Sequence, residues 1–165
     1  MEIVIEIAII LLFLLCLYNA KKSSKELWLI FLGLIYAIIF ENLNVILSAG
    51  KTGGYVYSSN FNIFIWNVPL FVSLAWAILI YVSYKLVNIS NIKESRRPFA
   101  DAVFITLIDI ALDPFATRLG LWDWNGYGLT DGFFGVAGNN FLGWLLVSFV
   151  FMFLFRKFID LKKKY

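Results

Sequence analysis

The sequence predicts an all-α, polytopic membrane protein that crosses the bilayer about five times, at roughly 20 residues per crossing. Of its 165 residues, 61% are hydrophobic and only 15% are charged. Soluble domains are about half apolar and about one quarter charged. The mean hydropathy is +0.82, and the apolar residues gather in long runs separated by short loops. We therefore expect residues 1–165 to form a single transmembrane domain.

Five apolar segments account for the predicted spans, and each is long enough to cross a bilayer at about 1.5 Å per residue. The first segment follows no basic residue and precedes no small-residue cleavage site, so we interpret it as a retained helix rather than a signal peptide. The segments are Ile3–Asn19, Leu27–Ala49, Asn67–Val87, Phe99–Gly120 and Asn140–Ile159.

The basic residues indicate how these spans are oriented. Of the 14 lysines and arginines, 12 fall after the first segment, around the third loop or at the C-terminus, and only Lys51 and Arg118 fall on the other side. Because basic loops stay in the cytoplasm, we expect the N-terminus outside and the C-terminus inside a prokaryotic cytoplasmic membrane, bacterial or archaeal. The basic clusters are topology signals, so nucleic acid is not an expected partner.

The composition also limits the chemistry that the chain can perform. It has one cysteine, Cys16, and no histidine, so we expect neither a disulfide framework nor a metal site. The remaining reactive groups are carboxylates, hydroxyls, amides and aromatic rings.

Two predicted outer loops, Gly50–Trp66 and Leu121–Asn139, are rich in Gly, Tyr, Trp and Asn. They either fold back over the helices or form ordinary flexible turns. A shift of the chain by 72 residues places Glu41 on Asp113. This match is either a coincidence or the trace of a parallel two-helix repeat, with a cleft between its halves.

Three carboxylates inside the predicted spans, Glu41, Asp109 and Asp113, are the candidate catalytic residues. Counted from the cytoplasmic ends of their spans, they share one layer in the outer half of the membrane. Ionisable groups there are costly and indicate function. Two carboxyls in such a low-dielectric site do not both ionise readily, so one can stay a neutral acid. Alternatively, the three pair with Arg118, hydroxyls and amides and only hold the helices together.

Other polar residues near this layer have more ordinary expected roles. Pro114 is expected to bend or break the fourth helix. Glu6 and Asp101 lie near the ends of their spans, where we expect structural roles. Hydrogen bonds to the carboxyls or to a water are expected from Asn42, Asn44 and Thr117.

Aromatic residues surround the carboxylate layer. Trp76 and Trp144 fall deep in their spans, and an aromatic face there can stabilise a positive charge that develops on carbon. The others either anchor the protein at the membrane interface or line the site. The candidate substrate-binding residues are Trp76, Trp144, Trp122, Trp124, Tyr55, Tyr57, Tyr127, Asn67 and Asn140.

Several motifs between Glu41 and Trp144, a stretch of 104 residues, follow a known pattern. They are Glu41, Gly54-Tyr55-Val56-Tyr57, Val68-Pro69, Ala75-Trp76, Asp113-Pro114, Gly120-Leu121-Trp122-Asp123-Trp124, Gly126-Tyr127 and residues 135–144. The chain resembles a shortened member of the carotenoid biosynthesis protein family, which includes CruF-like carotenoid hydratases and bisanhydrobacterioruberin hydratase. The family's members are longer, and Ala137 stands where the pattern has proline.

The resemblance implies addition of water to a terminal C=C bond of an isoprenoid, by protonation through a shielded tertiary cation. It implies Asp113 or Asp109 as the acid and Glu41 as its partner or as the group that positions water. Trp76, Trp144 and Trp122 would form the aromatic wall, and no metal or organic cofactor is required.

The expected partners are a lipophilic polyene, which enters sideways from the lipid bilayer, and a second copy of the chain if an oligomer completes the cavity. Three other functions remain open. An isoprenoid cyclase or isomerase uses the same acid chemistry, and a non-enzymatic membrane-complex subunit or lipid-binding protein uses none. A proton-coupled or ion-coupled transporter would need an oligomer.

Overall fold

The computed structural model describes residues 1–126 and 132–160, and within them it confirms an all-α, polytopic membrane protein. The helices are α1 (Glu2–Ala20), α2 (Ser24–Ser48), α3 (Leu70–Ile89), α4 (Arg97–Arg118) and α5 (Gly138–Phe155), with a short helix η1 (Glu94–Arg96) before α4 and a π-helical turn η2 (Arg156–Asp160) after α5. The strands are β1 (Gly54–Tyr57), β2 (Phe64–Ile65), β3 (Val68–Pro69) and β4 (Trp122–Asn125).

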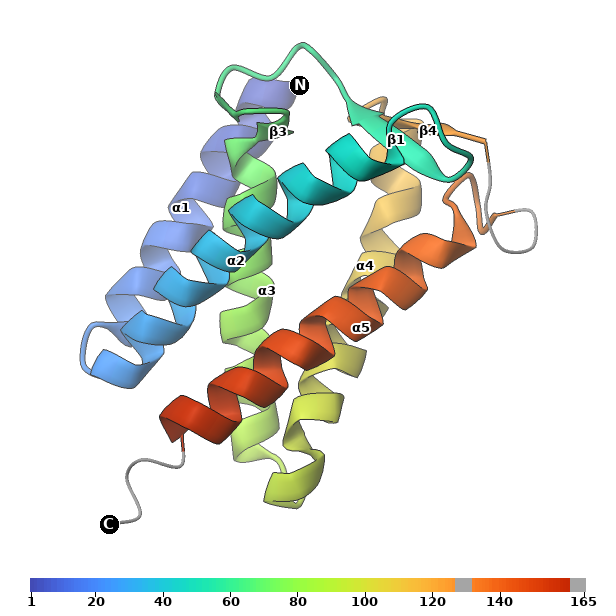
Figure 1. Cartoon of the computed structure of the whole chain (residues 1–165). Coiled ribbons are helices and arrows are strands. Elements are labelled where there is room, and N and C mark those ends of the chain that lie inside the picture. The colour runs from blue at the N-terminus through green and yellow to red at the C-terminus, as the bar shows by residue number, and fades with distance from the viewer. Residues whose placement is uncertain (127–131, 161–165) are drawn as a thin grey trace.

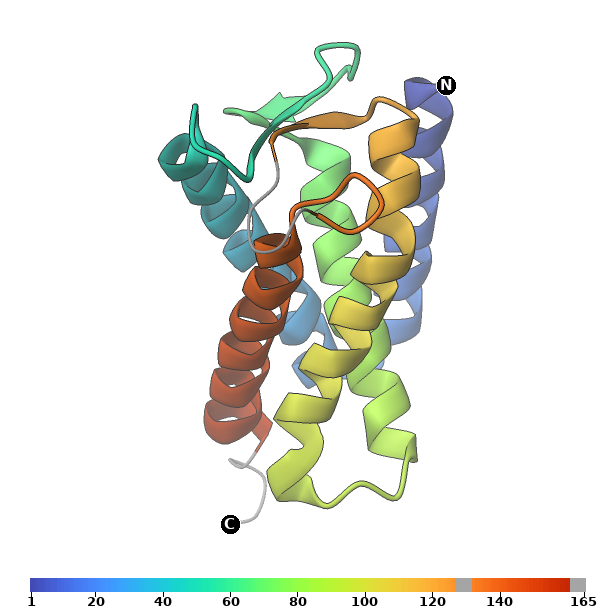
Figure 2. The same cartoon turned by 90° about the vertical axis from the view of Figure 1, so that its right-hand side faces the viewer.

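Among the described residues, α1, α2, α3 and the run Gly138–Ile159 are long and apolar enough to cross a membrane. The helix α4 has the length but carries Asp101, Asp109 and Asp113, all of which are buried inside the bundle. It runs between the same two ends as the other helices (Figures 1 and 2). The fourth predicted span is therefore a helix of the bundle whose polar groups face inward.

The helix ends agree closely with the predicted spans because they follow local signals. Ser23 caps α2 by accepting a hydrogen bond from the Glu26 backbone N–H at 3.4 Å, and Pro98 stands in the first turn of α4, where a missing N–H costs nothing. Pro114 does not break α4, which continues for another turn to Arg118. A proline in a packed membrane helix is tolerated when neighbouring helices support the backbone.

One predicted boundary was wrong. The third span was expected to begin at Asn67, but α3 begins at Leu70, because the preceding residues form a small hairpin in which Ile65 pairs with Val68. Trp66 adopts a φ of 56° in the turn of this hairpin. The turn therefore holds Asn67 outside the helix.

The two outer loops pair with each other across the outer end of the bundle. Strand β1 runs antiparallel to β4, and Tyr55 lies opposite Trp124 while Tyr57 lies opposite Trp122. Gly54 lets the start of β1 lie close to the end of α2, since a Cβ there would lie 2.2 Å from the Ser48 carbonyl oxygen. Figure 1 shows this sheet over the ends of the helices, so the loops form a cover rather than free turns.

The N-terminus and the C-terminal end of α5 lie at opposite ends of the bundle (Figure 1). The N-terminus and the sheet share one end, and the α1–α2 turn and the α3–α4 connection share the other (Figure 1). The basic loops after α1 and before α4 therefore lie at the same end, as the predicted topology requires. The two units α2–β1–α3 and α4–β4–α5 also repeat the order helix, strand, helix.

The two acids with expected structural roles are both buried. Glu6 accepts hydrogen bonds from the Asn62 backbone N–H at 2.9 Å and from the Asn62 side chain at 2.6 Å. It is therefore covered by the first outer loop instead of lying at the membrane interface. Asp101 is fully buried and accepts from Arg156 Nε at 2.6 Å and Nη2 at 3.0 Å. Arg156, counted above among the topology signals, joins α5 to α4.

Candidate functional site

Glu41 is the centre of the first half of the site. It lies on α2 near the outer end of the bundle and is only 3% exposed. Trp76 on α3 donates its indole N–H to Glu41 Oε1 at 2.8 Å. On the other oxygen, Tyr55 donates a short hydrogen bond and Tyr57 a longer one of 3.3 Å. All three partners are hydrogen-bond donors, so they hold both Glu41 side-chain oxygens in place as acceptors.

The two tyrosines of β1 keep their protons. Burial, followed by the charge of the Glu41 carboxylate, raises the pKa of Tyr55 and of Tyr57 well above the ordinary value of a tyrosine. Both hydroxyls therefore remain donors over the physiological pH range. Strand β1 carries these residues on one face because alternate residues of a strand point to the same side.

Asp109 and Asp113 form the second half of the site. They lie one turn apart on one face of α4, and both are buried. Asn140 in the first turn of α5 bridges them, with its side-chain nitrogen 2.7 Å from Asp113 Oδ2 and 3.2 Å from Asp109 Oδ2. The two carboxyls thus share one neutral donor, the Asn140 amide.

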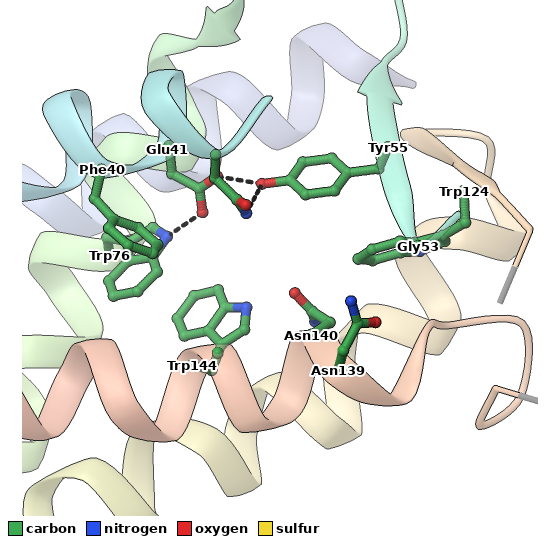
Figure 3. Close-up of a pocket in the computed structure, with 11 residues that line it drawn as sticks. Phe40, Glu41, Gly53, Tyr55, Trp76, Trp124, Asn139, Asn140 and Trp144 are labelled. Atoms are coloured by element: carbon green, nitrogen blue, oxygen red, sulfur yellow. Dashed lines mark hydrogen bonds between the residues drawn. The ribbon is translucent and has the colours of Figure 1, made fainter. Parts of the chain in front are cut away.

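The two halves are close enough to act together. Asn140 belongs to both, since it contacts the two aspartates and lines a cavity that Glu41 also lines. A cavity of about 90 Å³ lies beside them, and Glu41, Asn140, Tyr55, Trp76 and Trp144 are among its lining residues. Figure 3 shows these side chains pointing toward one space between α2 and α5. Of the three carboxylates predicted as catalytic, Glu41 lines this cavity, whereas Asp109 and Asp113 are not among its lining residues and adjoin it through Asn140.

The two deep tryptophans meet at the cytoplasmic side of this space. Trp76 and Trp144 stack with their ring centroids 3.9 Å apart and their planes 10° apart. Phe40 packs on Trp76 with a centroid distance of 6.1 Å. These rings make an apolar wall beside the hydrogen-bonded carboxylate of Glu41.

The other candidate substrate-binding residues take varied positions. Trp124 lines the cavity and packs against Tyr55, with ring centroids 4.8 Å apart. Trp122 packs on Tyr57 at 5.8 Å, on the Asp113 side of the site. Asn67 is exposed in the hairpin turn, and only its backbone N–H takes part in a contact, with Asn42 at 2.9 Å. Tyr127 lies outside the described residues.

The expected hydrogen-bond partners support the site indirectly. Asn44 donates to the Tyr55 hydroxyl at 3.1 Å, and that hydroxyl in turn donates to Glu41. Thr117 accepts from the Trp124 indole at 3.2 Å. Asn42 donates to the Ile38 carbonyl at 2.8 Å. These residues hold the strands and aromatic rings around the carboxylates rather than the carboxylates themselves.

Of the alternative in which the acids pair with Arg118, hydroxyls and amides, the hydroxyl and amide partners are present, but Arg118 forms no salt bridge with the acids among residues 1–126 and 132–160. The Arg118 guanidinium lies 5.8 Å from the centre of the Phe134 ring. Within the same residues, no cation forms a salt bridge with Glu41, Asp109 or Asp113. The hydrogen-bond partners of the three carboxyls within these residues are neutral amide, phenol and indole groups.

The structure adds four lining residues that the sequence analysis did not select, and Asn44, which was expected only as a hydrogen-bond partner; the four are Phe40, Gly53, Asn139 and Gly143. Two of them, Asn139 and Gly143, lie in the motif of residues 135–144, and Gly53 lies beside the Gly54–Tyr57 motif. Their position in these motifs was the available signal. No cluster of metal-ligating side chains occurs in the part of the chain that the structure describes.

The chain matches one protein family, described as "Carotenoid biosynthesis protein", over residues 1–164. This match extends well beyond the stretch from Glu41 to Trp144 that carried the resemblance. No curated protein and no solved structure matches the chain. The family implies a role in carotenoid biosynthesis at a membrane, with a lipophilic isoprenoid as the substrate class. The match over almost the whole chain shows that this protein belongs to the carotenoid biosynthesis protein family.

Proposed function

We propose that this protein is a hydratase that adds water to a terminal C=C bond of an acyclic carotenoid or a related isoprenoid. The observation that carries the proposal is the amide of Asn140, which bridges Asp109 and Asp113 at the edge of a cavity that Glu41 also lines. This combination offers an acid and an acceptor beside an apolar wall.

The acid is one carboxyl of the aspartate pair. The protonated carboxyl transfers its proton to the less substituted carbon of the terminal double bond, and the π electrons form the new C–H bond. The other carbon becomes a tertiary cation. Asp113 is the first candidate because its contact with Asn140 is the shorter one, at 2.7 Å against 3.2 Å for Asp109. That contact fixes its orientation.

The cation is quenched by water in the cavity. The water oxygen bonds to the tertiary carbon and loses a proton to Glu41, whose two oxygens are held in place by Trp76, Tyr55 and Tyr57. The proton then returns through cavity water to the aspartate, so the net change is the addition of one water molecule. The volume of about 90 Å³ accommodates water beside a small apolar group.

The aromatic wall protects the cation. The faces of Trp76 and Trp144 carry negative electrostatic potential, which stabilises positive charge within about 6 Å. Exclusion of bulk water by the β1–β4 sheet limits quenching to the water that the cavity admits. The proposed location is the cytoplasmic membrane of a prokaryote, with the site in the outer half, and no metal or organic cofactor takes part.

The test is expression in a host that accumulates acyclic carotenoids, followed by mass analysis of the extracted lipids. Wild type should yield a product heavier by one water. Asp113→Asn, Asp109→Asn and Glu41→Gln should each reduce that product. The reduction should be at least about 100-fold for the residue that transfers the proton. Asp123→Asn, the same change at an exposed residue of β4, should leave it unaltered.

The other candidate functions give different outcomes in the same experiment. A cyclase or isomerase yields a product of unchanged mass, because its cation loses a proton. A lipid-binding protein or complex subunit yields no product, and Asp113→Asn alters only its stability. Well-folded wild-type protein that leaves every acyclic carotenoid unchanged would contradict the hydratase proposal.

A further inference from the structure

The cavity is too small to enclose a whole carotenoid. Its volume is about 90 Å³, whereas an engineered cavity of about 150 Å³ binds benzene, with six carbons. Only the end of a long polyene fits inside. The rest of the chain must leave the cavity through an opening, and for a lipophilic chain that opening must face lipid.

The helices α2 and α5 line two sides of the cavity, and both lie on the same side of α3 and α4 (Figures 1 and 2). Glu41 and Asn44 come from α2, and Asn140, Gly143 and Trp144 come from α5 (Figure 3). Trp76, from the buried helix α3, forms the inner wall. The gap between α2 and α5 is therefore the side of the cavity that faces away from α3.

The same two helices close together on the cytoplasmic side of the cavity. There the Tyr36 hydroxyl donates to the Val147 carbonyl at 3.1 Å. The Tyr36 ring also packs on Phe151, with a centroid distance of 5.0 Å. These contacts bound the gap from below, and the β1–β4 sheet lies at its outer end.

Gly143 lies in this gap, one turn from Asn140 and next to Trp144. A Cβ built on Gly143 meets no atom within 4 Å. Glycine in a helix interior costs about 1 kcal/mol relative to alanine, and no neighbouring backbone requires a glycine here. By contrast, a Cβ at Gly33 would lie 3.2 Å from Ile80 of α3. The space beside Gly143 is thus open, and no packing contact with the described residues requires a glycine at this position.

We propose that the gap between α2 and α5 is a lateral portal through which the polyene end reaches the carboxylates, and that Gly143 determines which chains can pass. This inference rests on the proposed function and adds the route by which the substrate reaches the site. The ligand that the portal takes is the open-chain, methyl-branched end of an acyclic, unsaturated isoprenoid. A side chain larger than hydrogen at position 143 projects into the path of that chain.

The test measures bound pigment as well as product. The variants Gly143→Ala, Gly143→Leu and Gly143→Phe are made in the carotenoid-producing host, and the pigment that co-purifies with each protein is quantified by its absorption spectrum. Bound pigment and hydrated product should fall together as the side chain grows, by at least about tenfold for Phe, because the ring fills the open space. Leu142→Phe, at an exposed neighbour outside the cavity lining, should retain both.

Misfolding is separated from blockage by thermal unfolding in detergent, since replacing a helical glycine should leave the unfolding temperature equal or higher. Asp113→Asn should keep the pigment and lose the product, which separates the portal from the chemistry. Pigment bound by wild type and lost in Gly143→Phe would support the portal even if no hydrated product ever forms. Gly143→Phe that carries as much pigment as wild type, or wild type that carries none, would overturn it.

Discussion

Trp76 and Trp144 stack face to face, with ring centroids 3.9 Å apart, although they belong to helices from different halves of the chain. Trp76 comes from α3 and Trp144 from α5. The edge of Trp76 donates to Glu41 while its face meets Trp144. This relationship links the aromatic wall to the acceptor carboxylate, so each ring holds the other in the orientation that the site requires.

The stack should be measurable as an energetic coupling. Trp144→Leu removes the ring that stacks on Trp76. Trp76→Phe replaces the indole with a smaller ring that lacks the N–H bound to Glu41. Because stacked aromatic pairs contribute about 0.5–1.5 kcal/mol beyond burial, the double variant should be less destabilised than the sum of the two single ones by that amount. Thermal unfolding in detergent measures it. Strict additivity would mean that the stack contributes nothing to stability.

Tyr55 and Tyr57 should differ in importance. Tyr55→Phe leaves an oxygen of Glu41 with one donor fewer and leaves the Asn44 amide without its acceptor. Loss of a buried partner costs about 1–3 kcal/mol, so Tyr55→Phe should lower the unfolding temperature clearly. Tyr57→Phe should cost less because its bond is 3.3 Å long and its side chain is half-buried.

The tyrosine comparison uses the same chemical change at two positions of one strand. Each variant is compared with wild type for unfolding temperature and for product. A larger effect at Tyr57 than at Tyr55 would show that the Glu41 carboxylate is held in another way.

The ion pair between Asp101 and Arg156 should stabilise the fold without affecting the chemistry. Arg156→Met leaves a fully buried carboxylate without its cation, which costs about 3–5 kcal/mol. Adding Asp101→Asn should recover part of that loss, because the remaining group is neutral. Both proteins should form the same products as wild type, since Asp101 lies about two turns from Asp109 along α4.

Unfolding temperatures and product masses of the single and double variants check this prediction. If Arg156→Met unfolds like wild type, the pair contributes no net stability. If it changes the product mass, the two ends of α4 are coupled.

The orientation in the membrane can be tested with single cysteines in a Cys16→Ala background. Lys51, in the segment between α2 and β1, and Lys93, in the segment between α3 and η1, are both exposed, and these two segments lie at opposite ends of the bundle (Figure 1). In intact cells, a membrane-impermeant maleimide should label Lys51→Cys but not Lys93→Cys, because basic loops stay inside. Permeabilised cells serve as the control, since both positions should react there. The reverse pattern would place the N-terminus in the cytoplasm.

Local signals explain why the helices could be predicted. The hydrophobic runs locate all five, and the expected ends of α2 and α4 lie within a few residues of the observed ones. The third span was placed too early because Trp66 and Asn67 form the turn of a hairpin. In so apolar a chain, hydropathy does not distinguish a short hairpin from the start of a helix.

The depth of the carboxylates also followed from counting residues along helices. The rise per residue of an α-helix is constant, so Glu41, Asp109 and Asp113 could be assigned to one layer before any helix was packed. Their grouping around one cavity could not be predicted, because the rotation of α2 relative to α4 depends on how both helices pack with α3 and α5. The same limit explains why Arg156 was taken for a topology signal and not for the partner of Asp101.

By itself, the sequence determined that this is a helical membrane protein of the carotenoid biosynthesis family, with three acids inside its helices. Hydrophobic runs and helical rise are local properties, which a linear sequence records completely. Only the tertiary structure decided that β1 pairs with β4, that Asn140 bridges two aspartates and that Gly143 borders open space. Each of these contacts joins segments far apart in the chain, and their geometry depends on how the helices pack.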